Sequence, residues 1–439
     1  MKLRPLNWSA RLILFVLAVL VGLSIDWRPK QVAGPPEVVE AFRTKGALLA
    51  GAAKTSLVPP FPTPIGGFSV RGNDPFRGVL VPPQARALVV QVGGRRMAFV
   101  SVELVVVDRA LRDKVAAKVA DLKLDDVVVG ATHSHASVGG YWNSTLASWL
   151  GLGSYQARIE TFLVDRIAAA IRQAVAHLVP ASVSVGRIEA SNYGANRDVP
   201  GGPVDRTLTG VRFVSTGGET LAQVIVFSVH PTILPMYSMK LSAEWPGAMS
   251  DALEQDGGGV ALFFQGDVGD TTWGKRAGSM PPDQRMVLFG QAVASDARGA
   301  VAAGGNGTAV VELAHARVRF HLPPCDASGS VPWPLNRLAS NLLEWEAFPG
   351  TGEVTYTELG PLSVAAVPGE VVAELGLPWQ RKLHATLLGL TDAYLGYVET
   401  PERFRAREGE AKRMYFGAAL PGLLFGALAR ARAAALGTP

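Results

Sequence analysis

Residues 126–140 read Asp-Val-Val-Val-Gly-Ala-Thr-His-Ser-His-Ala-Ser-Val-Gly-Gly, and this stretch organises the chain. Its first residues have strand character, and His133 and His135 follow two residues apart. Because a strand places residues i and i+2 on one face, two imidazoles at a strand end can reach one metal ion, or one metal ion and one substrate. A His-x-His pair alone is also typical of a polar loop after a strand, so its partners must come from elsewhere in the chain.

Composition limits the class of protein. The chain has 439 residues, of which 48% are hydrophobic and 18% charged, with 48 glycines and 30 prolines. These values predict a compact, loop-rich α/β protein and exclude general disorder. The net charge of +5 is mild for this length, and no run of Lys and Arg indicates nucleic acid. The single cysteine, Cys325, excludes an internal disulfide and a thiolate cluster, so any metal must use His, carboxylate, Tyr or water.

The N-terminus has the pattern of an export signal. Residues 1–11 carry three basic groups, residues 12–25 carry no charge, and Trp8 and Trp27 flank the apolar run. No clear Ala-x-Ala cleavage site follows, so we expect an uncleaved signal anchor with its basic end in the cytoplasm. A cleaved signal peptide is the alternative, and would make the protein secreted. The basic flank argues against a buried core helix.

We expect three segments: a signal anchor or signal peptide over 1–27, a linker over 28–45, and one large catalytic domain over 46–439. The catalytic domain is then extracytoplasmic, in the periplasm or outside the cell. Strands are predicted over residues 46–53, 87–92, 97–107, 126–129, 181–188, 210–214, 221–229, 260–264, 308–322, 352–359 and 362–367. Helices are predicted over residues 108–122, 155–178, 243–254, 281–303, 378–388 and 411–436. Since strict βαβ alternation is missing, the predicted fold is α/β with mixed β-sheets flanked by helices, preceded by the N-terminal anchor helix.

Further chemically active residues follow other predicted strands. His230 ends the apolar run 226–229 and is followed by a proline, as a metal ligand or a core histidine would be. The loop after the strand at 260–264 holds two carboxylates, Asp267 and Asp270, beside Thr271 and Thr272. Such a loop can support a metal site or supply a nucleophile, although an Asp/Gly turn explains it equally well.

Two more segments continue this series. Glu370 follows a strand and a Pro-Gly turn, where it is either a site carboxylate or the first residue of a helix. Tyr394 and Tyr397 lie in an apolar, glycine-containing context that also suits core aromatics. Each of these segments alone is a weak signal.

Taken together and in this order, the segments resemble the catalytic domain of the neutral/alkaline non-lysosomal ceramidase family. The resemblance is carried by residues 132–140, 196–198, 228–230, 267–272, 368–370 and 397–404, which are similar to the family's Thr-His-Thr-His-Ser-Gly-Pro-Gly-Gly, Asn-Arg-Ser, Ala-Val-His, Asn-x-Gly-Asp-Val-Ser, Pro-Gly-Glu and Tyr-Val-Thr-Thr-x-Glu-Glu-Tyr motifs. It extends over roughly residues 46–436, and we expect no counterpart of the family's C-terminal immunoglobulin-like domain.

The resemblance implies a zinc-dependent amidohydrolase acting on an N-acyl lipid such as a sphingolipid. The residues that match the family's zinc ligands are His133, His230, Glu370 and Tyr397. Two imidazoles and a carboxylate are ordinary ligands of catalytic zinc and leave room for water or substrate.

Three further residues match positions at the family's reaction centre. His135 and Arg197 correspond to substrate-contacting positions, where an imidazole can donate a proton and a guanidinium can polarise a carbonyl. The family's serine is Thr272 here, and its asparagine is Asp267. Because zinc-activated water needs no serine, we favour attack by that water and expect Thr272 to act as a positioning contact.

The resulting hypothesis is an amidase at a membrane, with an N-acyl lipid or related small amide as substrate and no nucleic-acid partner. Two other classes stay open. The Ser-to-Thr and Asn-to-Asp differences suggest a non-catalytic lipid- or glycan-binding relative, although four retained ligands argue against it. Asp267 and Asp270 could recruit a second metal ion for ester or phosphoester hydrolysis.

Overall fold

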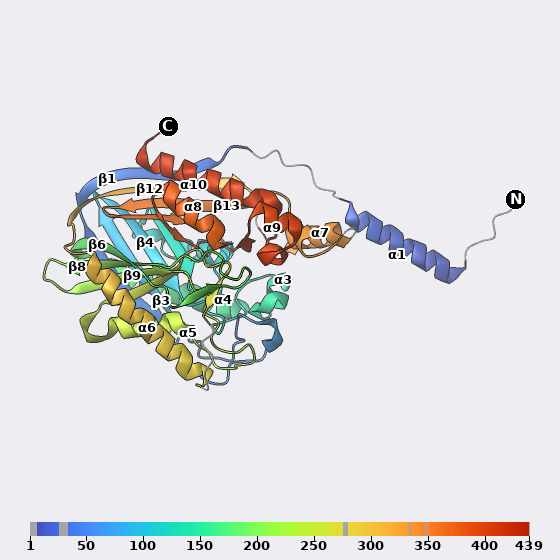
Figure 1. The fold of residues 1–439 in the computed structure, drawn as a ribbon, viewed down its shortest axis with the longest axis horizontal. Coiled ribbons are helices and arrows are strands. Elements are labelled where there is room, and N and C mark those ends of the chain that lie inside the picture. The colour runs from blue at the N-terminus through green and yellow to red at the C-terminus, as the bar shows by residue number, and fades with distance from the viewer. Residues whose placement is uncertain are drawn as a thin grey trace.

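The computed structural model describes residues 7–25, 34–274, 280–332, 335–346, 348 and 350–438. Two β-sheets packed face to face form the centre of the fold (Figure 1). The larger sheet has the order β10 (Val260–Gln265), β9 (Thr220–Phe227), β8 (Thr207–Ser215), β6 (Val179–Glu189), β2 (Leu49–Ser56), β3 (Gln84–Val92), β4 (Arg95–Val102) and β5 (Asp126–Ala131). The smaller sheet has the order β1 (Glu37–Ala47), β12 (Val310–His321), β13 (Thr351–Leu359), β14 (Leu362–Ala366) and β16 (Thr386–Leu388).

Helices cover the outer faces of both sheets. The helices are α1 (Trp8–Ser24), α2 (Arg109–Lys118), α3 (Thr145–Ala147), α4 (Ala157–Ala176), α5 (Glu244–Glu254), α6 (Pro282–Ala303), α7 (Leu335–Glu346), α8 (Ala373–Leu383), α9 (Pro401–Ala406) and α10 (Leu420–Leu436). Helices α4, α5 and α6 pack on the larger sheet, and α10 packs on β12 and β13 of the smaller one (Figure 1). The expected α/β architecture of mixed sheets flanked by helices is confirmed, because β4–β5, β9–β10 and β14–β16 are parallel while the other pairs within these sheets are antiparallel.

The strand β5 shows why the chain packs in layers. Val127 and Val129 face the core under α2 and α4, whereas Val128 faces the core between the two sheets. All six residues of β5 are buried. A strand buried on both faces is typical of parallel pairing. The position of β5 between two apolar layers therefore requires the apolar run that identified this strand in the sequence.

Several boundaries differ from those expected. Residues 37–47, assigned in part to a linker over 28–45, form β1, which pairs antiparallel with β12. The helix expected over 378–388 is α8, which begins at Ala373 and ends where His384 adopts a left-handed conformation, before β16. The helix expected over 411–436, with an interruption near Pro421 and Gly422, is α10, which begins at Leu420 after a one-turn helix Gly417–Ala419 whose first residue has a φ of 67°. Residues 26–33, in the expected linker and anchor, lie outside the described residues.

Helix α1 matches the apolar N-terminal segment, and its large apolar side chains are exposed. It is shorter than a comfortable membrane span. In the described part of the chain, residues 417–436 are long and apolar enough to cross a membrane, but this helix packs on the smaller sheet and contributes to its core. Anchoring by α1 stays a prediction.

Candidate metal centre

The expected site residues come together where several strands end. His133 follows β5, His230 follows β9, and Glu370 starts β15 (Glu370–Val371), which pairs in parallel with β17 (Tyr397–Val398). The register places Glu370 directly beside Tyr397. Segments that are more than two hundred residues apart in sequence therefore meet at one point.

The histidine pair lies beyond the end of its strand. Strand β5 ends at Ala131, and His133 has a φ of 69°, in a region that costs a non-glycine residue roughly 1–3 kcal/mol. Strand alternation, which was expected to place the two imidazoles on one face, therefore does not position them. They converge through this turn, which brings the Nε2 atoms of His133 and His135 to 3.1 Å.

Backbone carbonyls fix the orientation of all three imidazoles. The Nδ1 of His133 lies 2.7 Å from the carbonyl of Val105, that of His135 lies 3.0 Å from Gly67, and that of His230 lies 3.0 Å from Thr271. Since a carbonyl only accepts hydrogen bonds, each Nδ1 carries the proton. The Nε2 lone pairs are then free to face a common centre, as in metal-ligating histidines.

Glu370 completes this centre. Its Oε1 accepts a hydrogen bond of 2.8 Å from the Tyr394 hydroxyl. Its Oε2 lies 3.2 Å from the Nε2 of His133 and 3.1 Å from that of His230, and it receives no hydrogen bond from the described residues.

These contacts define a buried group of acceptors with few donors. Among the described residues, the guanidinium of Arg197 and the hydroxyl of Tyr397 reach the Nε2 of His230, at 3.4 Å and 3.3 Å. The ligand atoms of the three histidines lie within 4.8 Å of one another. Burial, followed by the charge of Arg197, lowers the pKa of His230 to about 4, and burial also lowers that of His135, so both are neutral at pH 7. Three lone pairs and one carboxylate oxygen therefore lie close together, and a metal cation bound among them would satisfy all four. This donor set fits a divalent metal ion.

Tyr397 and Arg197 border the same position. The Tyr397 hydroxyl lies 3.3 Å from the Nε2 of His230 and accepts a hydrogen bond of 3.0 Å from Arg197. Burial, together with the neighbouring charge of Glu370, raises the pKa of Tyr397 well above its usual range. Arg197 follows β7 (Gly194–Asn196), and Glu410 fixes its guanidinium through a hydrogen bond of 2.8 Å. The sequence did not predict that Glu410 anchors Arg197, because only the contact between the two side chains distinguishes Glu410 from other glutamates.

Thr272 lies apart from this group. It is half-buried on β11 (Thr271–Trp273), where it pairs with Ala195 of β7, and it is not among the described residues that line the cavity. Its role as a positioning contact stays a prediction. The neighbouring carboxylates form hydrogen bonds within the protein. Asp267 accepts one from the Ser228 hydroxyl, and Asp270 accepts from the Ala373 amide and the Asn196 side chain.

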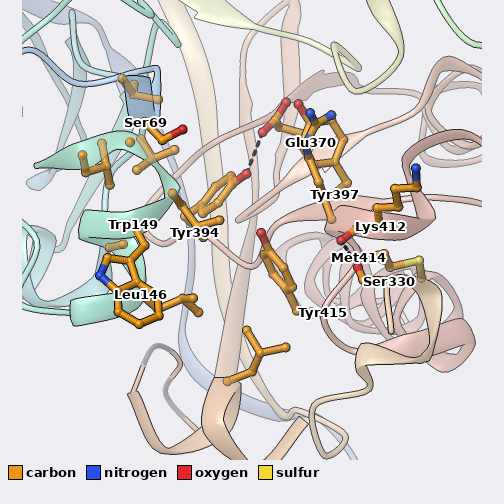
Figure 2. Close-up of a pocket in the computed structure, with 18 of the residues that line it drawn as sticks. Ser69, Leu146, Trp149, Ser330, Glu370, Tyr394, Tyr397, Lys412, Met414 and Tyr415 are labelled. Atoms are coloured by element: carbon orange, nitrogen blue, oxygen red, sulfur yellow. Dashed lines mark hydrogen bonds between the residues drawn. The ribbon is translucent and has the colours of Figure 1, made fainter. Parts of the chain in front are cut away.

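A cavity of about 870 Å³ leads from the centre to the surface. The residues that line it include His133, His135, Arg197, His230, Glu370, Tyr394 and Tyr397, together with Leu146, Trp149, Leu150, Leu342, Leu343 and Phe348. Figure 2 shows Leu146 and Trp149 on one side, Tyr397, Lys412 and Met414 on the other, and Tyr394 and Tyr415 between them. The polar end holds the expected site residues, and the apolar walls could not be inferred from sequence motifs.

Comparisons with known proteins agree with the fold. Residues 65–273 match the family model of the neutral/alkaline non-lysosomal ceramidase N-terminal domain, a segment that contains His133, His135, Arg197, His230 and Thr272. The neutral ceramidase of Pseudomonas aeruginosa is 27% identical over 215 residues, which are 44% of this chain and 32% of that protein. The neutral ceramidase of Mycobacterium tuberculosis is 26% identical over 229 residues, which are 45% and 35% of the two chains. The matched region thus spans about a third of the length of these curated relatives.

The fold is similar over a larger part of the chain. The crystal structure of neutral ceramidase from Pseudomonas aeruginosa superposes with a TM-score of 0.76 at 21% identity, covering 90% of this chain and 75% of that chain. A structure described as ceramidase complexed with C2 gives a TM-score of 0.74 at 20% identity, covering 90% and 76%. The match over residues 65–273 identifies this segment as a divergent neutral/alkaline non-lysosomal ceramidase N-terminal domain, and the similarity of fold extends over 90% of the chain.

Proposed function

We propose that the protein is a zinc-dependent hydrolase that cleaves the amide bond of an N-acyl lipid, with ceramide-like molecules as its substrate class. One observation carries the proposal: three Nε2 lone pairs converge at the polar end of a largely apolar cavity with the Oε2 of Glu370, which receives no hydrogen bond from the described residues. The names of the relatives indicate the amide, and the donor set suits zinc.

In this proposal His133, His230, Glu370 and Tyr397 hold the metal. Zinc would lower the pKa of a bound water to about 7, which makes a nucleophile available at neutral pH. The convergent acceptors exclude anions from the centre, and Arg197, held by Glu410, keeps a fixed positive charge beside it. That charge polarises the substrate carbonyl and stabilises the negative charge that develops on its oxygen.

The remaining step is a proton transfer. Water adds to the amide carbon, the C–N bond breaks, and the products are a carboxylate and an amine. The neutral His135 is placed to accept the proton that the water loses and to return it to the departing nitrogen, since its Nε2 faces the centre at 3.1 Å from that of His133. The apolar cavity walls accommodate the acyl chain and exclude bulk water.

Metal analysis of the purified full chain tests the site. We expect one zinc ion per chain in the wild type and loss of that zinc in the His133→Ala/His230→Ala double variant. A chain without zinc, or a double variant that keeps it, contradicts the assignment. A His177→Ala variant is the matched control, because His177 is an exposed histidine outside the cavity.

Hydrolysis tests the chemistry. A panel of fluorogenic N-acyl amides and the matching esters should show amide cleavage that is lost in Glu370→Gln. Activity confined to esters would transfer the proposal to ester hydrolysis, and binding of the panel without turnover would favour a non-catalytic relative.

A further inference from the structure

Exposed apolar side chains gather around the mouth of the cavity. We call this group the apolar rim, and it consists of Val70, Trp149, Leu150, Met236, Tyr237, Leu335 and Leu342. Trp149 is 75% exposed and Tyr237 is 77% exposed. Exposing such large aromatic rings to water is unfavourable unless another surface covers them. Exposed apolar side chains that come from several neighbouring segments beside a cavity mark an interaction site.

The members of the rim belong to segments in contact with one another. Trp149 and Leu150 lie in the short helix Ser148–Leu152, which contacts the one-turn helix Ser69–Arg71 that contains Val70. Arg71 donates to the carbonyls of both Met236 and His135, so it connects the rim to the centre. Helix α7 carries Leu335 and Leu342 and contacts α3.

Helices α3 and α7, which contribute residues to the cavity wall, lie at the end of the molecule from which α1 extends (Figure 1). Helix α1 contacts α7, and the side chain of Asn341 donates to the carbonyl of Ile25 at 3.3 Å. The side chains that α1 exposes are almost all apolar. The cavity mouth and this apolar helix are therefore on the same side of the described structure.

The chemistry of this surface fits a lipid bilayer. Trp and Tyr are the residues enriched at the boundary between water and acyl chains, and Trp149 and Tyr237 supply both. Lys412 and Arg337 are exposed on segments next to the cavity or on α7, where they attract anionic headgroups. Trp149, Leu150 and Leu342 also line the cavity, so the docked surface and the substrate path are continuous.

We propose that the apolar rim docks onto a bilayer containing anionic phospholipid, so that the cavity opens directly into the membrane. The N-acyl substrate then passes from the bilayer to the metal centre without crossing water. The passage of substrate rests on the proposed function, whereas the docking of the rim does not.

Depth-dependent quenching tests the docking. The chain has one cysteine, Cys325, which is buried, so a cysteine introduced at a surface position accepts a single fluorescent label. We would label Leu150→Cys, Leu335→Cys and, as control, Val310→Cys in the full chain. Val310 is also exposed and apolar, but it is the first residue of the 12-residue strand β12. The cavity residue Asp326 follows the opposite end of that strand.

Vesicles of phosphatidylcholine and phosphatidylglycerol with brominated acyl chains should quench the labels at Leu150 and Leu335 at least about threefold more than the label at Val310. Equal quenching at the three positions, or none, overturns the proposal, since α1 alone would tether all three labels equally. Quenching only after addition of a protein extract would assign the rim to a protein partner and also overturn it. This result does not depend on whether the protein hydrolyses amides.

A second measurement addresses substrate passage. The Val70→Glu/Tyr237→Glu double variant changes two rim residues that do not line the cavity, and Val310→Glu is its control. We expect roughly tenfold lower turnover of an N-acyl lipid in vesicles and unchanged turnover of a water-soluble short-chain amide. Equal turnover of the vesicle substrate by the two variants contradicts direct uptake from the membrane.

Discussion

Two buried polar clusters lie near opposite ends of β5, and they differ in how their charges are balanced. At the start of the strand, Arg317 of β12 donates to Asp126 at 2.8 Å, to Asp392 at 2.8 Å and to Glu353 at 3.2 Å. Beyond its end, the Oε2 of Glu370 lies beside the Nε2 atoms of His133 and His230 and receives no hydrogen bond from the described residues. The carboxylates of the first cluster are paired within the protein, whereas this carboxylate oxygen can take a cation from outside. Complete pairing is typical of a structural network, and a concentrated deficit indicates a functional site.

The two clusters are also connected. Asp392 accepts from the Val129 amide of β5 at 2.7 Å and has a φ of 62°. It begins the loop that leads to Tyr394, whose hydroxyl donates to Glu370. The structural network therefore holds in place β5, which leads to His133, and the loop that carries Tyr394, both of which support the candidate metal centre.

Glu370→Gln should give the largest effect. It removes a charge that the centre uses for binding a cation, so we expect hydrolysis to fall about 10⁴-fold. The free energy of unfolding without metal should be unchanged or higher, since the new amide can donate to a histidine Nε2. Turnover and urea unfolding measure the two quantities. Destabilisation by several kcal/mol would show that this cluster is structural as well.

Arg317→Met should give the reverse result at the other cluster. It leaves Asp126, Asp392 and Glu353 buried without their shared cation, which costs about 3–5 kcal/mol of unfolding free energy. Urea unfolding measures this loss. Arg172→Met is the control, because the Arg172–Asp121 pair is exposed and should contribute less than about 1 kcal/mol. Equal effects of the two substitutions would remove the distinction between buried and exposed pairing here.

The pH dependence of stability should follow Glu353. Three arginines contact its carboxylate, Arg109, Arg317 and Arg319, and although burial raises its pKa, they lower it to about 2 from an ordinary value of 4.5. The folded pKa lies below the unfolded one, so this stabilisation is complete above pH 4.5 and is lost as the pH falls towards 2. We expect a contribution of about 2 kcal/mol after allowing for solvent screening.

Unfolding of wild type and Glu353→Gln between pH 7 and pH 2.5 measures this contribution. The variant should start less stable and lose less stability on acidification, so that the two curves converge at low pH. Parallel curves would mean that other carboxylates control the acid limb.

The sequence predicted the elements whose pattern is local. The apolar run of β5 identified a buried strand, and the ordered motifs brought His133, His230 and Glu370 into one hypothesis. Strand β1 was mistaken for a linker, because an alternating pattern that includes Glu40, Arg43 and Lys45 resembles a polar segment until β12 pairs with it. The apolar rim was missed for a related reason. Exposed side chains such as Trp149 carry no periodic signal, and only the fold brings their segments together.

Thr272 gives the smallest predicted effect and the finest test of the comparison. Because it lies on β11 and does not line the cavity, it contacts neither cluster's cation position. We expect Thr272→Ser and Thr272→Val to lower the turnover of an N-acyl amide by less than about tenfold, which is under about 1.4 kcal/mol in the transition state. A nucleophilic role would instead separate the two variants, with Ser active and Val inactive. Single-turnover kinetics of both variants, with the metal content measured in the same samples, distinguishes a missing nucleophile from a shift of the adjoining Thr271 carbonyl that orients His230.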